Sequence, residues 1–257
     1  MLLRKLSIAL ALALLLAACG GSDEGDAGSA APDTTVAGDE ITDEEMSDEE
    51  MTDEEMTDEH MPTTFTVTVT NTSDSAELAT PLAPGAFIVH TSMETLFADG
   101  IVDRGEGLEA LAEDGDPSSL VTSLGALATV STSGAFANPD GGGEAGPALP
   151  GSSYSFTFEA TPGDYLSFAT MFVQSNDWFF APASSGISLF EGDMPVAGDL
   201  TDLIRLWDAG TEVDEVPGEG ANQAPRQEGP NTGDNQSAPI AEVDGYSGTI
   251  TVSIAVG

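Results

Sequence analysis

The chain is poor in the residues that usually carry covalent or phosphate chemistry. Its 257 residues include one cysteine, two histidines and five basic residues, against 45 acids, for a formal net charge of −40. With a single cysteine, the folded part must be held together by core burial or by metal rather than by disulfides. So few cations cannot neutralise phosphates, which argues against nucleic acid as a partner. The same shortage argues against a basic patch for anionic lipid.

Sequence signatures of catalysis are also lacking. The two histidines, His60 and His90, are accompanied by no G-x-S-x-G nucleophile turn, no CxxC pair and no histidine cluster. The glycine run at 141–143 is followed by Glu and Pro, not by the Lys-Ser pair of a phosphate loop. We therefore expect a protein that is not an enzyme. A secreted carbohydrate-active hydrolase is the alternative, because so acidic a chain could pair two carboxylates in a cleft.

Residues 1–18 are typical of a lipoprotein signal peptide. Arg4 and Lys5 precede the apolar run 6–16, which is shorter than the roughly 20 residues that a membrane span requires. Small residues then lead to Cys19, as in bacterial lipoproteins, where the cysteine is lipidated and the peptide is cut before it. An ordinary secretory signal is the alternative. We expect a protein of the cell envelope, facing the periplasm or the exterior, that touches the membrane only through the lipid on Cys19.

An acidic linker, predicted to be disordered, follows over residues 19–62. It contains no aromatic residue and carries a five-residue acidic repeat over 41–60. A period of five matches neither a helix nor a strand, and a run of like charge with few apolar residues favours disorder. We expect a tether. A calcium-sequestering tail is the alternative, although the repeat lacks the glycine turn of a dedicated calcium loop.

From residue 63 to 257 the pattern becomes that of one folded domain. Apolar and polar residues alternate at 65–70, 154–159 and 248–254, as in half-buried strands, and 165–173 reads as a more deeply buried strand. Helix-like spacing occurs at 107–112 and 120–127, and Asp116-Pro117 marks a helix start. These patterns predict a mainly β, antiparallel sandwich with a short helical insertion. The alternating first and last strands would suit pairing with each other.

Two short motifs stand out within this domain. Ser-Asn-Asp-Trp-Phe at 175–179 and Leu-Trp-Asp-Ala-Gly-Thr-Glu at 206–212 each place an aspartate, Asp177 or Asp208, where a predicted strand gives way to a loop. Aspartates at strand ends can direct their oxygens into a shared site, and a hard cation such as calcium requires several oxygens. The alternatives are an Asx-turn cap for Asp177 and ordinary turn chemistry for Asp208.

Two further motifs occur along the chain, Asp-Arg-Gly-Glu-Gly at 103–107 before the two aspartate motifs and Pro-Arg-Gln at 225–227 after them. Together the four motifs follow one another in the order that a known family shows. Over about residues 63–257 the chain resembles the spondin N-terminal (F-spondin) domain family, in a bacterial lipoprotein version. The resemblance implies a C2-like β-sandwich and a role in adhesion or matrix interaction, with an extracellular protein or glycan as partner. A structural surface protein without a specific ligand is a further alternative.

The resemblance also implies a calcium ion bound by Asp177 and Asp208 together with a glutamate that maps to Glu159. A simple hairpin over 154–173 would separate Glu159 from Asp177, so Glu212 and Asp214 are alternatives for the third ligand. For the adjoining Trp178 and Trp207 we expect core packing rather than an exposed aromatic platform. For Arg226 we expect a structural ion pair.

Overall fold

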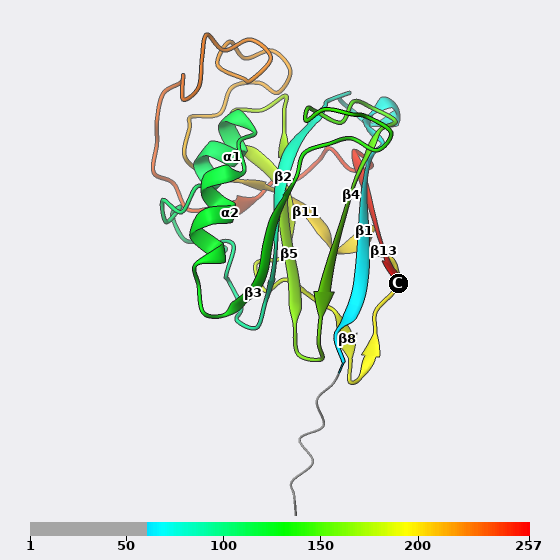
Figure 1. The fold of residues 1–257 in the computed structure, drawn as a ribbon. Helices are drawn as coiled ribbons and strands as arrows, with labels where there is room; N and C mark the ends of the chain where they lie inside the picture. Colours follow the sequence, from blue (N-terminus) through cyan, green and yellow to red (C-terminus); the bar gives the residue numbers. More distant parts are fainter. Residues whose placement is uncertain (1–60) are drawn as a thin grey trace, which may run out of the picture. The chain divides into compact units, whose positions relative to one another are not determined.

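Two antiparallel sheets packed face to face make the body of the domain (Figure 1). The computed structural model describes residues 61–257, so the predicted signal peptide, the lipidation of Cys19 and the acidic repeats lie outside the described residues. The prediction of a mainly β, antiparallel sandwich with a small helical insertion is confirmed. Within residues 61–257, no helix has the length and apolar character needed to cross a bilayer.

The four-stranded sheet contains the first and last strands of the domain. Its order is β10 (Gly198–Asp199), β13 (Ile250–Val256), β1 (Thr63–Asn71) and β4 (Ser153–Ala160). The expected pairing of the first and last strands is confirmed, because β1 and β13 are antiparallel neighbours with Phe65 opposite Val256. Alternation explains the two faces of β1: Phe65, Val67 and Val69 are fully buried, and the threonines between them point outward.

The central strands of the larger sheet are buried on both faces. Its order is β12 (Ala241–Glu242), β11 (Ile204–Asp208), β6 (Trp178–Pro182), β5 (Tyr165–Phe172), β2 (Leu82–His90) and β3 (Val130–Phe136), and β7 (Ile187–Ser188) also pairs with β5. A small hairpin, β8 (Phe190–Glu191) with β9 (Met194–Pro195), follows β7. Burial on two sides explains why β5 reads as an almost continuous apolar run.

Two helices cover the outer face of this sheet, beside β2 and β5 (Figure 1). They are α1 (Leu108–Asp114) and α2 (Ser118–Gly125), with one-turn 3-10 helices at Ser73–Ser75 and Thr201–Leu203 elsewhere. The predicted helix start is confirmed, since the Asp116 carboxylate accepts the backbone N–H of Ser118, 3.0 Å away. The inner faces of α1 and α2 bury their leucines in one cluster with Phe97, Phe179 and Trp207.

Separate hydrophobic cores fill the two interfaces. Phe65, Phe156 and Phe168 belong to the core between the sheets, and Trp178 lies in the same core. Trp207 belongs to the core under the helices. The predicted packing role of both tryptophans is confirmed, because Trp178 is 8% and Trp207 3% exposed.

The simple hairpin considered for 154–173 is wrong. β4 and β5 follow each other in the chain but lie in different sheets, with β4 paired to β1 and β5 to β2. The turn 161–164 between them carries the chain across the sandwich, and Asp164 closes it by accepting the N–H of Thr161 at 2.8 Å. This crossing decides where the predicted site residues lie.

Candidate acidic cation site

The pairing of β6 with β11 brings Asp177 and Asp208 together. Trp178 and Asp208 are direct partners in the ladder, so Asp177, one residue earlier, lies beside the end of β11. The backbone extends this contact, because the N–H of Ala209 donates to the carbonyl of Asp177 at 3.1 Å. The two aspartates predicted from separate motifs therefore share one end of the larger sheet.

Asp177 has one satisfied oxygen and one that has no hydrogen-bond donor. Its side chain is fully buried, and its Oδ2 accepts the backbone N–H groups of Thr211 (2.7 Å) and Glu212 (3.0 Å) and the Thr211 hydroxyl (3.2 Å). Its Oδ1 is buried and accepts no N–H or hydroxyl donor, and the Asp177 carboxyl also interacts with the Asp208 carboxyl. Leaving a buried acceptor unpaired costs about 1–3 kcal/mol, and more when the group is charged. The geometry thus fixes the carboxylate firmly and leaves one oxygen available.

Neighbouring acids make this oxygen harder to keep ionised. Burial raises the pKa of Asp177 to about 7; the backbone N–H of Glu212 opposes the shift, and the charges of Asp208 and Asp214 add to it. Burial likewise raises the pKa of Asp208, with the N–H of Gly210 and a hydrogen bond to the Asp177 carboxyl opposing it. Burial also raises the pKa of Asp214 to about 6, and the Asp208 charge contributes. When all three are ionised, the carboxyls of Asp177, Asp208 and Asp214 repel one another.

Asp208 also fulfils the turn role weighed from the sequence. Its Oδ1 accepts the backbone N–H of Gly210 at 2.7 Å, which forms an Asx turn at the end of β11. Gly210 itself lies at φ +69°, and a Cβ there would approach the carbonyl oxygen of Ala238 to 2.4 Å. The turn therefore needs glycine, and it points the Asp208 carboxyl toward Asp177.

Glu212 is a second buried acid with a free oxygen. It is 1% exposed; its Oε2 accepts the side-chain amide of Asn176 at 3.1 Å, while its Oε1 has no hydrogen-bond partner. The loop at Gly233 closes directly over this carboxylate, because a Cβ there would lie 2.5 Å from Oε2. Burial raises the pKa of Glu212, and the charges of Asp114 and Glu215 add to it.

The sequence did not suggest Glu113, which belongs to the same acidic region. It lies on α1, is 2% exposed, and has an Oε1 without a hydrogen-bond partner. Burial raises its pKa to about 7; the Thr211 hydroxyl opposes the shift, and the charges of Glu212, Glu109 and Asp177 add to it. The helical spacing of 107–112 predicted the helix, but only the packing of α1 on β5 and β6 brings Glu113 to this end of the sheet.

Glu159 does not join the two aspartates. It lies on the exposed face of β4, opposite Thr64 in the four-stranded sheet, while its neighbours Phe158 and Ala160 point into the core. The turn after β4 leads into the start of β5, whereas Asp177 follows the end of β5. The length of one strand therefore separates Glu159 from Asp177, and the nearby third acids are Asp214 and Glu212.

These residues provide the type of ligand that a hard cation prefers. Carboxylate oxygens gather here, one of them buried and unpaired on Asp177. Across residues 61–257, no group of three His, Cys, Asp or Glu side chains is arranged to enclose a metal ion as it stands. The unpaired Oδ1 is nevertheless the atom that fits a cation, since its partner oxygen is already held by three donors.

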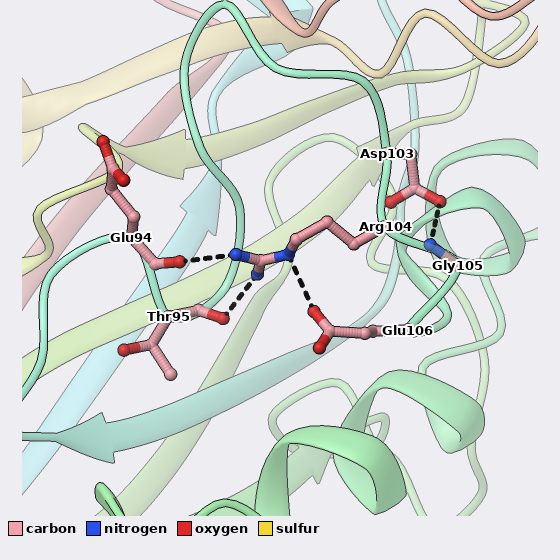
Figure 2. Close-up of polar contacts among 6 residues, drawn as sticks. All are labelled: Glu94, Thr95, Asp103, Arg104, Gly105 and Glu106. Atoms are coloured by element: carbon pink, nitrogen blue, oxygen red, sulfur yellow. Dashed lines mark hydrogen bonds and ion pairs between the residues drawn. The ribbon is translucent and has the colours of Figure 1, made fainter.

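The motif at 103–107 makes a structural clamp (Figure 2). The Arg104 guanidinium donates to the carbonyls of Glu94 (2.9 Å) and Thr95 (2.8 Å), and its Nε pairs with Glu106 Oε2 at 2.9 Å. Asp103 accepts the N–H of Gly105 at 3.0 Å. The clamp ties the loop after β2 to the segment that leads into α1.

Arg226 is also structural, although its partners differ from the expected ion pair. It donates to the carbonyl oxygen of Gly220 and to the side-chain amide oxygens of Gln174 and Gln223. The ion pairs formed by arginine within the described residues are Arg104 with Glu106 and Arg205 with Glu242. Arg226 therefore holds the 216–227 loop against the turn that precedes Asp177.

His90 is a packed polar side chain. It is fully buried on β2, with Nδ1 2.6 Å from the carbonyl of Ser92 and Nε2 2.9 Å from the hydroxyl of Ser167. Burial lowers its pKa, opposed by the Ser92 carbonyl and the charge of Asp164. Because Ser167 is also buried, substrate has no direct access to this Ser–His pair.

No protein-family model and no curated protein matches this chain. Its function is therefore inferred from its own residues.

Proposed function

We propose that residues 63–257 form a calcium-binding module of spondin type that a lipid on Cys19 holds at the cell envelope, where it binds an extracellular protein or glycan. The unpaired, buried Oδ1 of Asp177 is the observation on which this proposal depends. A cation at this oxygen would offset the mutual repulsion of Asp177, Asp208 and Asp214.

Calcium suits this chemistry better than a transition metal. Calcium takes six to eight oxygen ligands in flexible geometry, and the site offers carboxylate oxygens without thiol or imidazole groups close by. Asp177 and Asp208 would be its first two ligands, and Asp214 or Glu212 would supply a third carboxylate. When bound, the ion supplies positive charge that links the loops after β5 and β11.

The spondin assignment rests on the order of the four motifs and on a sandwich fold that agrees with it. In the structure, two of those motifs carry Asp177 and Asp208, and the other two carry the structural arginines Arg104 and Arg226. A binding module, rather than an enzyme, is supported by the burial of His90 and Ser167.

The first experiment compares calcium with sodium at matched ionic strength. A ligand that binds only the folded form stabilises it by RT ln(1 + [L]/Kd), about 2.7 kcal/mol at a hundredfold excess over Kd. The melting temperature should rise more with calcium than with sodium, and Asp177→Asn with Asp208→Asn should abolish the difference. Equal stabilisation by both salts in the wild type would contradict a specific site, because screening alone stabilises so acidic a surface.

A charge-matched control separates the site from general charge removal. Glu144→Gln with Glu159→Gln also removes two carboxylates, both exposed and neither beside Asp177. This control should keep the calcium response. If it loses the response as fully as the aspartate pair does, the effect comes from net charge and not from the site.

The anchoring part of the proposal has its own test. Cys19→Ser should release the protein from the membrane fraction into the soluble fraction, because the apolar run before it is too short to span a bilayer. Mass spectrometry should find acyl chains on Cys19 of the wild type. Wild-type protein without lipid in the medium would refute anchoring and leave the calcium site untouched.

A further inference from the structure

A cavity of about 420 Å³ opens between α1, α2 and the loop at Asn231. Four acids line it, together with glycine, alanine and serine residues and Asn231. The acids are Glu106, Glu109, Glu113 and Asp114. Asp177 and Asp208 are not among the lining residues, so the cavity adjoins the proposed calcium site through Glu113 but does not contain these two ligands.

Three of these acids already have partners of their own. Glu106 pairs with Arg104 (Figure 2), Asp114 accepts the side-chain amide of Gln227 at 2.9 Å, and Glu109 accepts that of Asn231 at 3.2 Å. The loop with Gln227 and Asn231 therefore holds Asp114 and Glu109 in place, and Arg104 holds Glu106. The cavity is built by specific contacts and is more than a region of acidic surface.

Glu113 interacts with the Thr211 hydroxyl but keeps one oxygen without a partner. Its side chain is 98% buried, it lines the cavity, and its Oε1 has no hydrogen-bond partner. A buried carboxylate needs a positive partner or several hydrogen-bond donors to remain ionised. The described residues include three arginines and no lysine, and two of the arginines pair with Glu106 and Glu242 while Arg226 is bound by amide and carbonyl oxygens. None of the arginines in residues 61–257 pairs with Glu113, so a cationic ligand would supply the positive partner that keeps this carboxyl ionised.

The dimensions of the cavity favour an organic cation. A single metal ion fills only a small part of 420 Å³, whereas an alkyl chain needs space along walls that do not clash. Gly105, Gly107 and Ala110 supply such walls, and the hydroxyl of Ser123 adds an acceptor near the acids. An ammonium group donates three hydrogen bonds from one compact charge and so can use a carboxylate and a hydroxyl together.

We propose that this cavity binds a primary ammonium group on an alkyl chain, with Glu113 as its main counter-ion. The ammonium can belong to a free alkyl amine or to a lysine side chain of another protein, since both present the same group. Binding needs no covalent step and no metal. This second site would give the acidic domain selectivity for a cationic partner beyond the attraction of its net charge.

Calorimetry with three probes tests the proposal on the intact protein in calcium-containing buffer of low ionic strength. The probes are 1,5-diaminopentane, the amide of Nα-acetyl-lysine, and 1,5-pentanediol as a neutral control. One amine or both should bind at a single site, and the diol should not bind. Binding of the diamine alone identifies a free amine as the ligand, and binding of the lysine amide identifies a protein side chain. Failure of both amines, or many equivalent weak sites, would overturn the proposal.

Two variants locate the site by different means. Glu113→Gln keeps the shape and removes the counter-ion, so affinity should fall at least about tenfold, as expected for a lost charged hydrogen bond. Ala110→Leu keeps every charge and fills the cavity, so it should weaken binding to a similar degree. Glu144→Gln removes an exposed charge elsewhere and should change affinity less than about twofold.

Independence from the calcium site is tested in the same assay. Asp177→Asn should lose the calcium response and keep amine binding, because Asp177 does not line the cavity. If Glu113→Gln and Ala110→Leu both leave amine binding unchanged, the cavity is not the site. If Asp177→Asn alone abolishes amine binding, the amine is using the proposed calcium site and the inference is wrong.

Discussion

Asn71 ends β1 and Asp177 immediately precedes β6; both polar side chains are fully buried, yet their surroundings differ. The Asn71 amide donates to the carbonyls of Thr80 (2.8 Å) and Ala148 (2.9 Å), and its oxygen accepts the N–H of Ser73 at 3.0 Å. Asp177 uses one oxygen fully and leaves the other without a partner. The fully bonded amide is structural, whereas the half-bonded carboxylate has unused capacity for a ligand.

The largest effect on stability is expected at Asn71, whose side-chain amide and oxygen are all hydrogen-bonded. Asn71→Ala would remove three buried hydrogen bonds and leave the Ser73 N–H without a partner, so it should lower the free energy of unfolding by about 3–5 kcal/mol. Urea unfolding would measure the loss. Asn235→Ala in the exposed loop serves as the control and should cost less than about 1 kcal/mol. A loss at Asn71 no greater than in the control would mean that this network contributes little to stability.

The Asp177 carboxyl should make the free energy of unfolding depend on pH in the opposite way to an ion-paired carboxylate. The pKa of Asp177 is raised to about 7 in the folded state, so between pH 4 and pH 7 the unfolded state binds fewer protons than the folded state. The free energy of unfolding should therefore fall as pH rises through this range, by on the order of 3 kcal/mol in chelator.

Denaturant titrations at pH 4.5, 6 and 7.5 would measure this slope. Calcium should flatten it, because the cation binds the ionised form. Asp177→Asn should reduce it in chelator and leave the contributions of Glu113 and Asp214, whose pKa values burial also raises, while Glu159→Gln, which removes an exposed charge, should leave most of the slope. A wild-type slope that Asp177→Asn does not reduce would assign the pH dependence to these other acids and to the general acidity of the surface.

A pair of substitutions at one position separates the two oxygens of Asp177. In chelator at pH 8, Asp177→Asn should stabilise the domain by about 1–2 kcal/mol, because its amide oxygen can still accept from Thr211 and Glu212 while the charge repulsion disappears. Asp177→Ala should be less stable than Asp177→Asn, since both N–H groups lose their acceptor. Unfolding curves that place the two variants at the same stability would contradict the assigned roles.

The smallest effect is expected on the outer face of the four-stranded sheet. Thr68 and Ser155 form a cross-strand hydroxyl pair at 3.2 Å, and water can replace either partner. Thr68→Val should change the free energy of unfolding by less than about 0.5 kcal/mol, because exposed hydroxyls lose little on exchange and valine favours a strand. A loss of stability as large as that expected for Asn71→Ala would show that an exposed hydroxyl pair contributes as much as the buried hydrogen bonds of Asn71.

Local patterns predicted much of the fold. Apolar and polar residues alternate along β1, β4 and β13, because one face of each strand is buried, and this pattern can be recognised from the sequence alone. β3 was missed, since it contains small polar residues and Gly134. A Cβ at Gly134 would lie 2.6 Å from the Phe87 ring, so packing across the sheet requires glycine at this position. The same glycine weakens the strand pattern in the sequence, which is why β3 was not predicted.

The site was only partly predictable for the same reason. The predicted proximity of Asp177 and Asp208 is right, but the pairing behind it was not predicted: Asp177 immediately precedes β6, and it is β6, not the preceding β5, that pairs with β11. Glu159 was misplaced relative to them because sequence adjacency of β4 and β5 does not reveal that the chain crosses between sheets. Glu113 depends on the docking of a helix onto the sheet, which no local spacing in α1 encodes.

The position of β13 between β10 and β1 has a consequence for assembly. β1 pairs with β4 on one side, but its other edge stays open until β13, the last strand of the described residues, arrives. Such long-range pairing slows folding to the order of milliseconds to seconds. During that time an exposed edge of alternating valine and threonine can recruit other chains. The dense negative charge then keeps incomplete molecules apart, and so protects the protein before its fold is closed.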